Sequence, residues 1–311
     1  MSHEALEAIL GRLSEARMLV AGDLWLERVL RGQATQGAHG VLRVRGSQPE
    51  SLPGGAGGVA RAAAAIGART WVAGVLGQDA GSGELLRALA SAGVDAFGVV
   101  TDPGHPTGER LIAEIEGEAA GPWSALEIEL AAPPPLEGSA AQQMLSHIEP
   151  LIAQIGALVV AAFDLREPQQ ALAQLAESAR SQDKSVIGAG RGWLPPCDLA
   201  VVGPPDAGVG DDAARALMNE AGHRALIVPT PGWGARVYGA EAERGESIAG
   251  RESDGPRAWE RFVAGAATAA AAGADPLTAG RMAVAAAAVG GAAGTESAVT
   301  VDAIKRELDL N

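Results

Sequence analysis

The sequence predicts an α/β protein built on a doubly wound, mostly parallel sheet, and three observations lead to this expectation. Short apolar runs alternate with segments of helical periodicity along the 311 residues. The strand-like runs are apolar throughout rather than alternating, as in strands covered by helices on both faces. From about residue 139 the alternation is regular, which is typical of parallel sheets with crossover helices. We therefore expect one domain over residues 1–311, with ligands beyond the carboxyl ends of its strands.

The first half of the chain combines this pattern with a smaller β unit. Residues 4–15 carry leucine and isoleucine at helical spacing, and 18–22 is a buried strand that opens into a loop. Residues 24–47 form a β-excursion from the main sheet. The stretch 46–53 is interpreted as a turn, and an alanine-rich helix follows over 60–67. The remaining predicted elements are strands at 70–76, 96–100, 107–117 and 123–130 and a helix at 82–89.

The second half repeats strand and helix with few interruptions. Predicted strands cover 157–163, 184–188, 199–202, 225–228 and 235–238, the last two joined by a turn at 231–234. Predicted helices cover about 139–155, 168–181, a segment capped by Asp211, 257–272, 276–289 and 301–308.

Composition excludes several classes of function. The net charge is −14, from 38 acidic and 24 basic residues. This excess argues against nucleic-acid backbones and anionic membranes as partners, although a local nest of donors can still bind a small anion. The single cysteine, Cys197, allows no intrachain disulfide and suits a reducing cytoplasm. The N-terminus lacks a signal-peptide pattern, and the alanine-rich C-terminal runs are too weakly hydrophobic to span a membrane.

A glycine-rich stretch follows Pro53, with glycine at positions 54, 55, 57 and 58. Without side chains, its backbone N–H groups can approach a ligand closely at the positive end of a helix. A tight turn before a packing helix is the alternative. Gly55-x-Gly57-x-x-Ala60 also fits a dinucleotide-binding pattern. Because the preceding residues are turn-like rather than a strand, we disfavour that interpretation.

Five short motifs occur in the order found in one known family. Gly22-Asp23-Leu24-Trp25-Leu26-Glu27 resembles a G-D-x-x-L-D sugar loop, and Pro53-Gly54-Gly55-Ala56 resembles a P-G-G-A-A-N-V-A loop. Gly77-Gln78-Asp79 resembles G-x-D, and His105-Pro106-Thr107 matches H-P-T. Gly294-Thr295, before Val299-Thr300, resembles a closing G-T-x-x-V-T. The chain thus resembles the ribokinase-like (PfkB) carbohydrate kinases, and most of all the heptose-7-phosphate kinase domain of ADP-heptose synthesis.

This resemblance implies a ribokinase-like α/β/α domain with a small β-lid, formed by about 24–50 and the strands near 107–130. In that family the lid covers the sugar and often pairs with a second subunit, so a homodimer through the lid is expected. ATP with Mg²⁺ would be the phosphoryl donor, and no residue is assigned as a metal ligand. The implied binding residues are Asp23, Glu27, Gly54 and Gly55 for the sugar, and Gly232, Gly234 and Asp254 for the nucleotide. A cap at a strand end is the alternative role for Asp23.

The catalytic segment departs from the family pattern. Where the family has D-x-T-G-A-G-D, this chain reads Asp254-Gly255-Pro256-Arg257-Ala258-Trp259-Glu260. Arg257 and Trp259 replace the two glycines that hold the phosphoryl group, and Glu260 replaces the aspartate that takes the hydroxyl proton. The indole would fill the space that the phosphate enters, and a shift of the base by ~1 Å can cost ~100-fold in rate. Arg257 suits either a phosphate contact or an ion pair with Asp254 or Glu260.

Other landmarks change as well. The family's asparagine after the glycine loop is Gly58, its D-P-K segment is Gly188-Ala189-Gly190-Arg191, and its N-x-x-E segment is Gly203-Pro204-Pro205-Asp206. Two hypotheses follow. The chain is either a pseudokinase that binds a sugar phosphate, a nucleotide or a partner and needs no cofactor, or an active ATP-dependent sugar kinase. In the second case Glu260 is the base and Arg257 contacts the phosphate.

Overall fold

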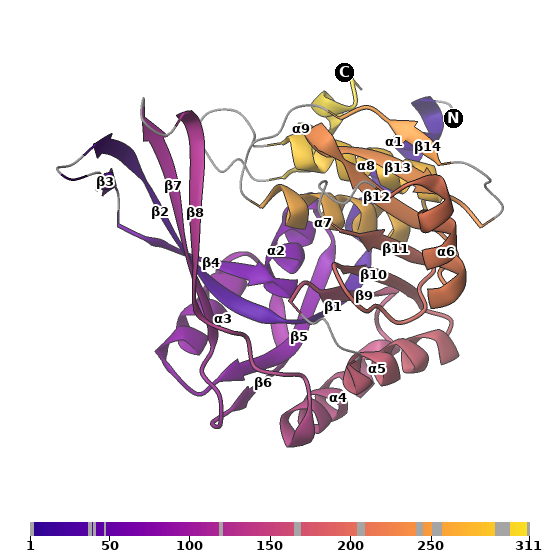
Figure 1. Ribbon diagram of the computed structural model, residues 1–311. Helices are drawn as coiled ribbons and strands as arrows, with labels where there is room; N and C mark the ends of the chain where they lie inside the picture. Colours follow the sequence, from indigo (N-terminus) through magenta and orange to yellow (C-terminus); the bar gives the residue numbers. More distant parts are fainter. Residues whose placement is uncertain are drawn as a thin grey trace.

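The computed structural model of the protein describes residues 3–36, 39, 42–46, 48–117, 121–164, 169–203, 209–240, 245–250, 257–289 and 299–309. Figure 1 shows a large sheet between two layers of helices, with a smaller sheet of long strands projecting beside it. The predicted α/β class with a mostly parallel sheet is confirmed.

Within the described residues the large sheet has nine strands in the order β14-β13-β12-β11-β10-β9-β1-β5-β6. Neighbours are parallel except for the pairs β12–β13 and β13–β14 at one edge. The strands are β1 (Arg17–Gly22), β5 (Arg69–Gly77), β6 (Asp95–Asp102), β9 (Ala157–Ala162), β10 (Ser185–Gly190), β11 (Leu199–Val202), β12 (Leu226–Thr230), β13 (Gly234–Tyr238) and β14 (Glu246–Ile248). This order reverses direction at β1, where doubly wound folds place their ligands.

Helices cover both faces of this sheet because its central strands are apolar on both sides. In β1, Met18 and Val20 pack into one core cluster, whereas Leu19 and Ala21 pack into the other. The first layer contains α1 (His3–Arg12), α2 (Ala56–Ile66), α3 (Ala80–Ser91), α7 (Ala258–Ala271), α8 (Pro276–Ala288) and α9 (Val301–Glu307). The second layer contains α4 (Gly138–Ile152), α5 (Gln170–Ser181) and α6 (Asp211–Ala221). None of the helices in the described part is long and apolar enough to cross a bilayer.

The second unit, which we call the small sheet, has the order β3-β2-β7-β8, with β4 also paired to β2. Its strands are β2 (Leu24–Gln36), β3 (Leu42–Gly46), β4 (Glu50–Gly55), β7 (Gly108–Gly117) and β8 (Gly121–Ala131). Because β2 follows β1 after one residue, the small sheet grows directly from the carboxyl edge of the large sheet. It therefore stands next to the position where a ligand is expected.

Two sequence expectations in this region were wrong. Residues 50–55 are not a turn but the strand β4, whose backbone pairs antiparallel with residues 24–29 of β2 despite Pro53 and the glycines. The helix after the glycines begins at Ala56 rather than Ala60, and its first N–H donates to the Asp23 carbonyl at 2.9 Å. Gly57 and Gly58 thus belong to the first turn of α2.

A third expectation also needs correction. Asp211 does not cap α6, because Gly210 holds the N-cap position. The Asp211 carboxylate instead accepts a hydrogen bond from the Tyr238 hydroxyl at 2.9 Å, so it connects α6 to β13. Three predicted landmarks, Asp206, Asp254 and Gly294-Thr295, lie outside the described residues.

Candidate functional site

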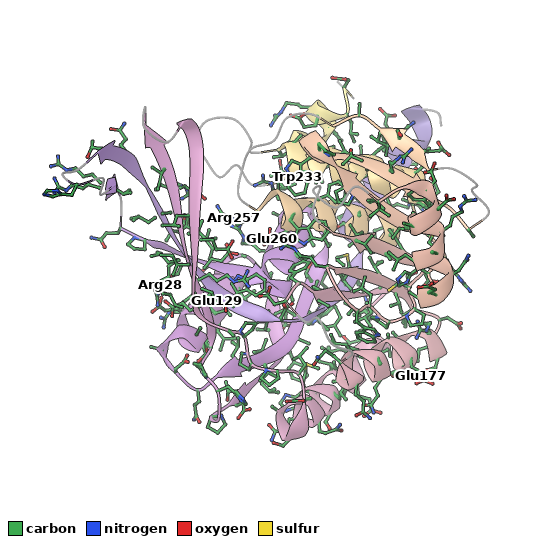
Figure 2. All side chains as sticks on the ribbon, in the orientation of Figure 1. Arg28, Glu129, Glu177, Trp233, Arg257 and Glu260 are labelled. Atoms are coloured by element: carbon green, nitrogen blue, oxygen red, sulfur yellow. The ribbon has the colours of Figure 1, made fainter. Side chains whose placement is uncertain are left out.

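A cavity of about 430 Å³ lies between the small sheet, the carboxyl end of β9 and the N-terminus of α7; we call it the central cavity. Its carboxylates are Glu27, Glu127, Glu129, Asp164 and Glu260. Its arginines and aromatic rings are Arg110, Arg191, Arg257, Trp25, Phe163 and Trp259. The volume is within the range of small-molecule sites, roughly 300–1,000 Å³. Figure 2 shows Arg257 and Glu260 between the small sheet and the helical layer.

Arg257 is the residue that joins α7 to the small sheet. It holds the N-cap position of α7 with φ of 72°, a left-handed conformation that glycine adopts readily and arginine rarely. Its side chain is 5% exposed. Nη2 donates to Glu114 Oε1 at 3.2 Å, and Nη1 lies 3.7 Å from Glu27 Oε2. Arginine thus adopts here a backbone conformation that glycine favours, and a buried guanidinium fills the site.

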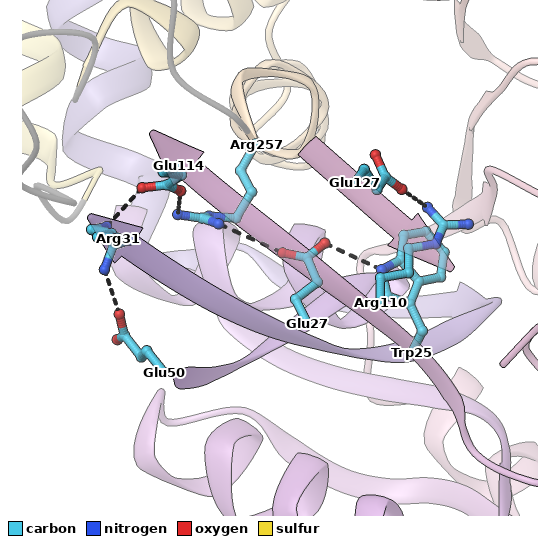
Figure 3. Close-up of polar contacts among 8 residues, drawn as sticks. All are labelled: Trp25, Glu27, Arg31, Glu50, Arg110, Glu114, Glu127 and Arg257. Carbon is cyan, nitrogen blue, oxygen red and sulfur yellow. Dashed lines mark hydrogen bonds and ion pairs between the residues drawn. The ribbon is translucent and has the colours of Figure 1, made fainter. Parts of the chain in front are cut away.

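These contacts belong to a longer chain of ion pairs, drawn in Figure 3. Glu114 on β7 also accepts a hydrogen bond from Arg31 Nε on β2 at 2.7 Å. Arg31 in turn donates from Nη1 to Glu50 on β4 at 2.8 Å. The chain therefore runs from β4 through β2 and β7 to α7. The described ion partners of Arg257 are Glu27 and Glu114. The predicted partner Asp254 lies outside the described residues, so that pair stays a prediction.

Glu27, the predicted sugar contact, is almost completely buried and lines the central cavity. Its Oε1 accepts a hydrogen bond from Trp25 Nε1 at 3.2 Å, whereas its Oε2 has no hydrogen-bond partner among the described residues. Burial, and after it the negative charge of Glu260, raises the pKa of Glu27, while the positive charge of Arg257 opposes this shift. Glu27 therefore holds a proton more readily than an ordinary glutamate does.

Asp23, the other acid of the sugar loop, takes a different position. It is 1% exposed and does not line the central cavity. Its two carboxylate oxygens accept backbone N–H groups of Phe163 at 3.1 Å and Asp164 at 2.6 Å. Burial raises the pKa of Asp23 from 3.8 to about 7, more than these hydrogen bonds lower it. The geometry supports the strand-end cap, since Asp23 connects β1 to the end of β9.

The glycines at 54 and 55 make room for Trp25. A Cβ on Gly54 would lie 2.1 Å from Trp25 Nε1, and a Cβ on Gly55 would lie 2.4 Å from the Asp23 carbonyl oxygen and 2.5 Å from the Trp25 ring. Gly55 also has φ of 61°. Both glycines, predicted as sugar contacts, thus have a packing role that explains them without a ligand.

Gly58 and Glu260 fit one another. A Cβ on Gly58 would lie 2.9 Å from Glu260 Cγ, so the side chain of Glu260 uses the space beside this glycine. The resemblance assigns asparagine to position 58 and aspartate to position 260. The two departures are therefore coupled in space: the longer acid is accommodated because the asparagine side chain is gone.

Trp259 belongs to a continuous series of aromatic contacts. The protein has six tryptophans, three phenylalanines and one tyrosine, and five of these rings follow one another here. Their centroids are separated by 6.3 Å for Trp25–Phe163, 5.9 Å for Phe163–Trp259, 6.3 Å for Trp259–Phe262 and 5.9 Å for Phe262–Trp233. Trp259 stacks nearly parallel on Phe262, at 12°. The indole at the family's second glycine position thus forms a wall of the cavity.

The nucleotide-side predictions concern the turn before β13. Neither Gly232 nor Gly234 lines the central cavity. A Cβ on Gly234 would lie 2.6 Å from Thr230 Oγ1 and 2.7 Å from the Ile248 carbonyl oxygen, so packing of β14 requires glycine there. Gly232 has φ of 73° and open space around it. Both assignments to a nucleotide remain predictions.

In the described part of the site, two side chains occupy positions where the resemblance expects glycines around a transferring phosphoryl group. Side chains of Arg257 and Trp259 stand where the resemblance expects two glycines at the N-terminus of α7. Among the described residues, no group of three His, Cys, Asp or Glu side chains is placed to hold a metal ion. The side chains of Arg257 and Trp259 form ion pairs and ring contacts there.

Sequence reasoning missed Arg110 and Glu114, which line or border the cavity. Arg110 stacks over the Trp25 ring at 4.0 Å and pairs with Glu127 at 3.1 Å, with Glu129 at 3.5 Å and with Asp164. A signal was present in the sequence. Residues 110, 112 and 114 are two positions apart along β7, so their side chains share the face that turns toward α7. The charged residues at 110 and 114 therefore indicated that this face of the strand is partly polar.

Comparison with known proteins identifies the family. The model of the pfkB family carbohydrate kinases matches residues 29–192, which end before Arg257. Among curated proteins, the chain is 31% identical over 153 residues to the bifunctional protein HldE of Trichlorobacter lovleyi, covering 48% of the chain and 30% of that relative. It is 33% identical over 180 residues to HldE of Alkalilimnicola ehrlichii, covering 56% and 35%. The chain thus spans about a third of the length of these relatives.

Solved structures agree on the fold. The acarbose kinase Mak1 superposes with a TM-score of 0.76 at 19% identity, covering 94% of this chain and 99% of that one. Phosphofructokinase-2 of Escherichia coli, in complex with fructose-6-phosphate, superposes with a TM-score of 0.70 at 20% identity, covering 95% and 98%. Because the family model matches more than half of the chain and the fold agrees, the protein belongs to the pfkB family of carbohydrate kinases.

Proposed function

We propose that this chain is a non-catalytic member of its family, a pseudokinase that binds a small ligand in the central cavity with the small sheet as a lid. One observation carries the proposal: the buried guanidinium of Arg257, at a position where the resemblance expects a catalytic-loop glycine, pairs with Glu27 and Glu114. In the family this loop binds the phosphoryl group. In this chain the same loop contacts the small sheet, which serves as the lid.

The energetics of the site also supports a pseudokinase. Phosphoryl transfer depends on positioned donors around the transferring group, and that space is taken by a guanidinium and an indole. Moving Arg257 away would leave Glu27 buried without its described ion partner, while Glu114 would keep only Arg31. Breaking a buried ion pair in this way costs ~3–5 kcal/mol. A substrate phosphate would have to supply that free energy before any chemistry began.

An active sugar kinase is the second candidate, and two observations favour it. The backbone at residue 257 retains its left-handed conformation, and Glu260 lies in the first turn of α7 facing the cavity. In this alternative Glu260 is the base, Arg257 contacts the phosphate, and ATP with Mg²⁺ is required. The ligand classes open to either candidate are a sugar, a sugar phosphate or a nucleotide.

The two candidates separate in a turnover assay. Phosphoryl transfer from MgATP to heptose 7-phosphate and to common hexoses is measured for the wild type, Glu260→Gln and Glu177→Gln, the last an exposed acid on α5. We expect no transfer above the rate without protein. Turnover that Glu260→Gln abolishes and Glu177→Gln retains would establish the kinase instead.

We also propose that the protein forms a homodimer through the outer face of the small sheet and acts in the cytoplasm. On β8, Leu126, Ile128 and Leu130 are 53%, 41% and 56% exposed, on the face opposite the acids that line the cavity. An exposed apolar row on an edge strand favours association. Sedimentation should give a dimer for the wild type and a monomer for Ile128→Glu; a monomeric wild type at about 10 µM contradicts the proposal.

A further inference from the structure

The central cavity has an excess of negative charge. Five carboxyl groups and three guanidinium groups line it, and although burial raises the pKa of Glu27 to about 8, the other four acids still outnumber the arginines. Two of the three arginines already form ion pairs with acids. Arg110 pairs with three acids, and Arg257 pairs with Glu27 and with Glu114, which does not line the cavity. The third, Arg191, is exposed at the rim. An additional anion would therefore enter a site that already has more negative than positive charge.

The excess is concentrated at one end of the cavity, where β2 meets α7. Glu27 is 3% exposed, and its Oε2 has no hydrogen-bond partner among the described residues. Glu260 is 9% exposed and close enough for its charge to act on Glu27. Arg257 and Arg61 both act on Glu27 with the opposite sign. A buried acceptor without a donor normally costs ~1–3 kcal/mol, so a ligand donor is expected there.

The neighbouring walls are aromatic. Trp259 and Phe163 contact each other with centroids 5.9 Å apart, and Trp25 continues the same wall. This wall already attracts one cation, because the guanidinium of Arg110 lies 4.0 Å from the Trp25 ring centre. Aromatic faces attract cations and also pack against the apolar faces of sugar-like rings. The cavity thus combines aromatic rings that can bind a cation with a carboxyl oxygen, Glu27 Oε2, that accepts no hydrogen bond from the described residues.

We propose that the ligand of the central cavity is a hydroxylated amine of sugar size, with its ammonium group between Glu27 Oε2 and Glu260. The inference rests on the proposed function in one respect, that this cavity binds a small molecule. An ammonium group supplies three donors and one positive charge, which matches the charge excess and an oxygen, Glu27 Oε2, that has an ion pair with Arg257 but accepts no hydrogen bond from the described residues. A phosphate monoester carries about −1.5 to −2 charges and would be repelled by the same groups.

Calorimetric titration of the full chain with three matched compounds tests the proposal: glucosamine, its neutral analogue N-acetylglucosamine, and glucose 6-phosphate. We expect glucosamine to bind at least about tenfold more tightly than N-acetylglucosamine, because charge-assisted hydrogen bonds are about twice as strong as neutral ones. Glucose 6-phosphate should give no binding heat. In Glu260→Gln the preference for the amine should fall about tenfold, and Glu177→Gln should behave as the wild type.

Three results would overturn the proposal: tighter binding of glucose 6-phosphate, equal binding of the amine and its acetylated analogue, or no binding of any compound at about 10 mM. The wild-type series decides this by itself, so a folding defect of Glu260→Gln does not affect the conclusion. Failure here is distinct from failure of the pseudokinase proposal. The latter fails only if MgATP supports turnover, whichever compound binds.

Discussion

Two residues close to the central cavity both have positive φ but differ in residue type. At the end of β4, which we call the β4 edge, Gly55 lies behind Trp25 with φ of 61° and ψ of −131°. At the N-terminus of α7, which we call the α7 edge, residue 257 has φ of 72° and ψ of 10° and is arginine. A Cβ at Gly55 would meet the Asp23 carbonyl oxygen at 2.4 Å, whereas the Arg257 side chain has two buried carboxylates to contact. A residue with positive φ must therefore be glycine where neighbouring atoms fill its Cβ space, and can be another residue in the left-handed region where that space is available.

The largest expected effect comes from filling the β4 edge. Gly55→Ala should lower the free energy of unfolding by about 3 kcal/mol or more, because it adds a steric clash to the cost of φ above zero. Gly138 is the matched control, since it has φ of 64° with nothing within 4 Å of its Cβ position. Gly138→Ala should cost only about 1 kcal/mol. Urea denaturation of both variants measures the difference; equal losses would show that backbone strain alone explains the glycine.

The next effect concerns the pH dependence of stability through Asp23. The folded protein raises the pKa of this carboxyl to about 7 through burial, so it binds the proton more tightly than the unfolded chain does. Its contribution to stability is therefore present at low pH and is lost as the pH rises from about 4 to about 7. Between pH 5 and pH 8 the stability of the wild type relative to Asp23→Asn should fall by about 3 kcal/mol.

Chemical denaturation of the wild type and Asp23→Asn at both pH values provides the measurement. Glu27, whose pKa is also raised, is present in both proteins, so its effect cancels in the comparison. A difference that stays constant, or grows toward pH 8, would mean that Asp23 is ionised throughout and serves as a charged cap.

The smallest expected effect isolates the backbone at the α7 edge. Arg257→Gly and Arg257→Ala both remove the guanidinium, so they lose the same ion pairs with Glu27 and Glu114. They differ only in that alanine must adopt the left-handed conformation at residue 257. Arg257→Gly should therefore be more stable by about 1 kcal/mol in the same denaturation assay. If alanine is equally stable, the first turn of α7 rearranges when the arginine is removed.

Much of the fold could be predicted because its signals are local. Apolar runs and alanine-rich helices located every strand of the large sheet except β14, and most of the helices. The β4 strand was missed because Pro53 and its glycines disfavour strand formation, and only pairing with β2 compensates for them. The role of Arg257 was missed for a different reason: its partner Glu114 lies 143 residues away, and no local pattern connects the two.

Our central proposal is that Arg257 stabilises the small sheet by linking it to the N-terminus of α7. Amide hydrogen exchange in the small sheet tests this proposal most directly. In Arg257→Gly, exchange in β2 and β7 should accelerate at least about tenfold, because the contacts of these strands with α7 are lost. Exchange in β9, at the centre of the large sheet, should not change. If exchange in β2 and β7 is unchanged, Arg257 does not stabilise the small sheet, and the pseudokinase proposal loses its main support. A phosphate contact would then be the better explanation for Arg257.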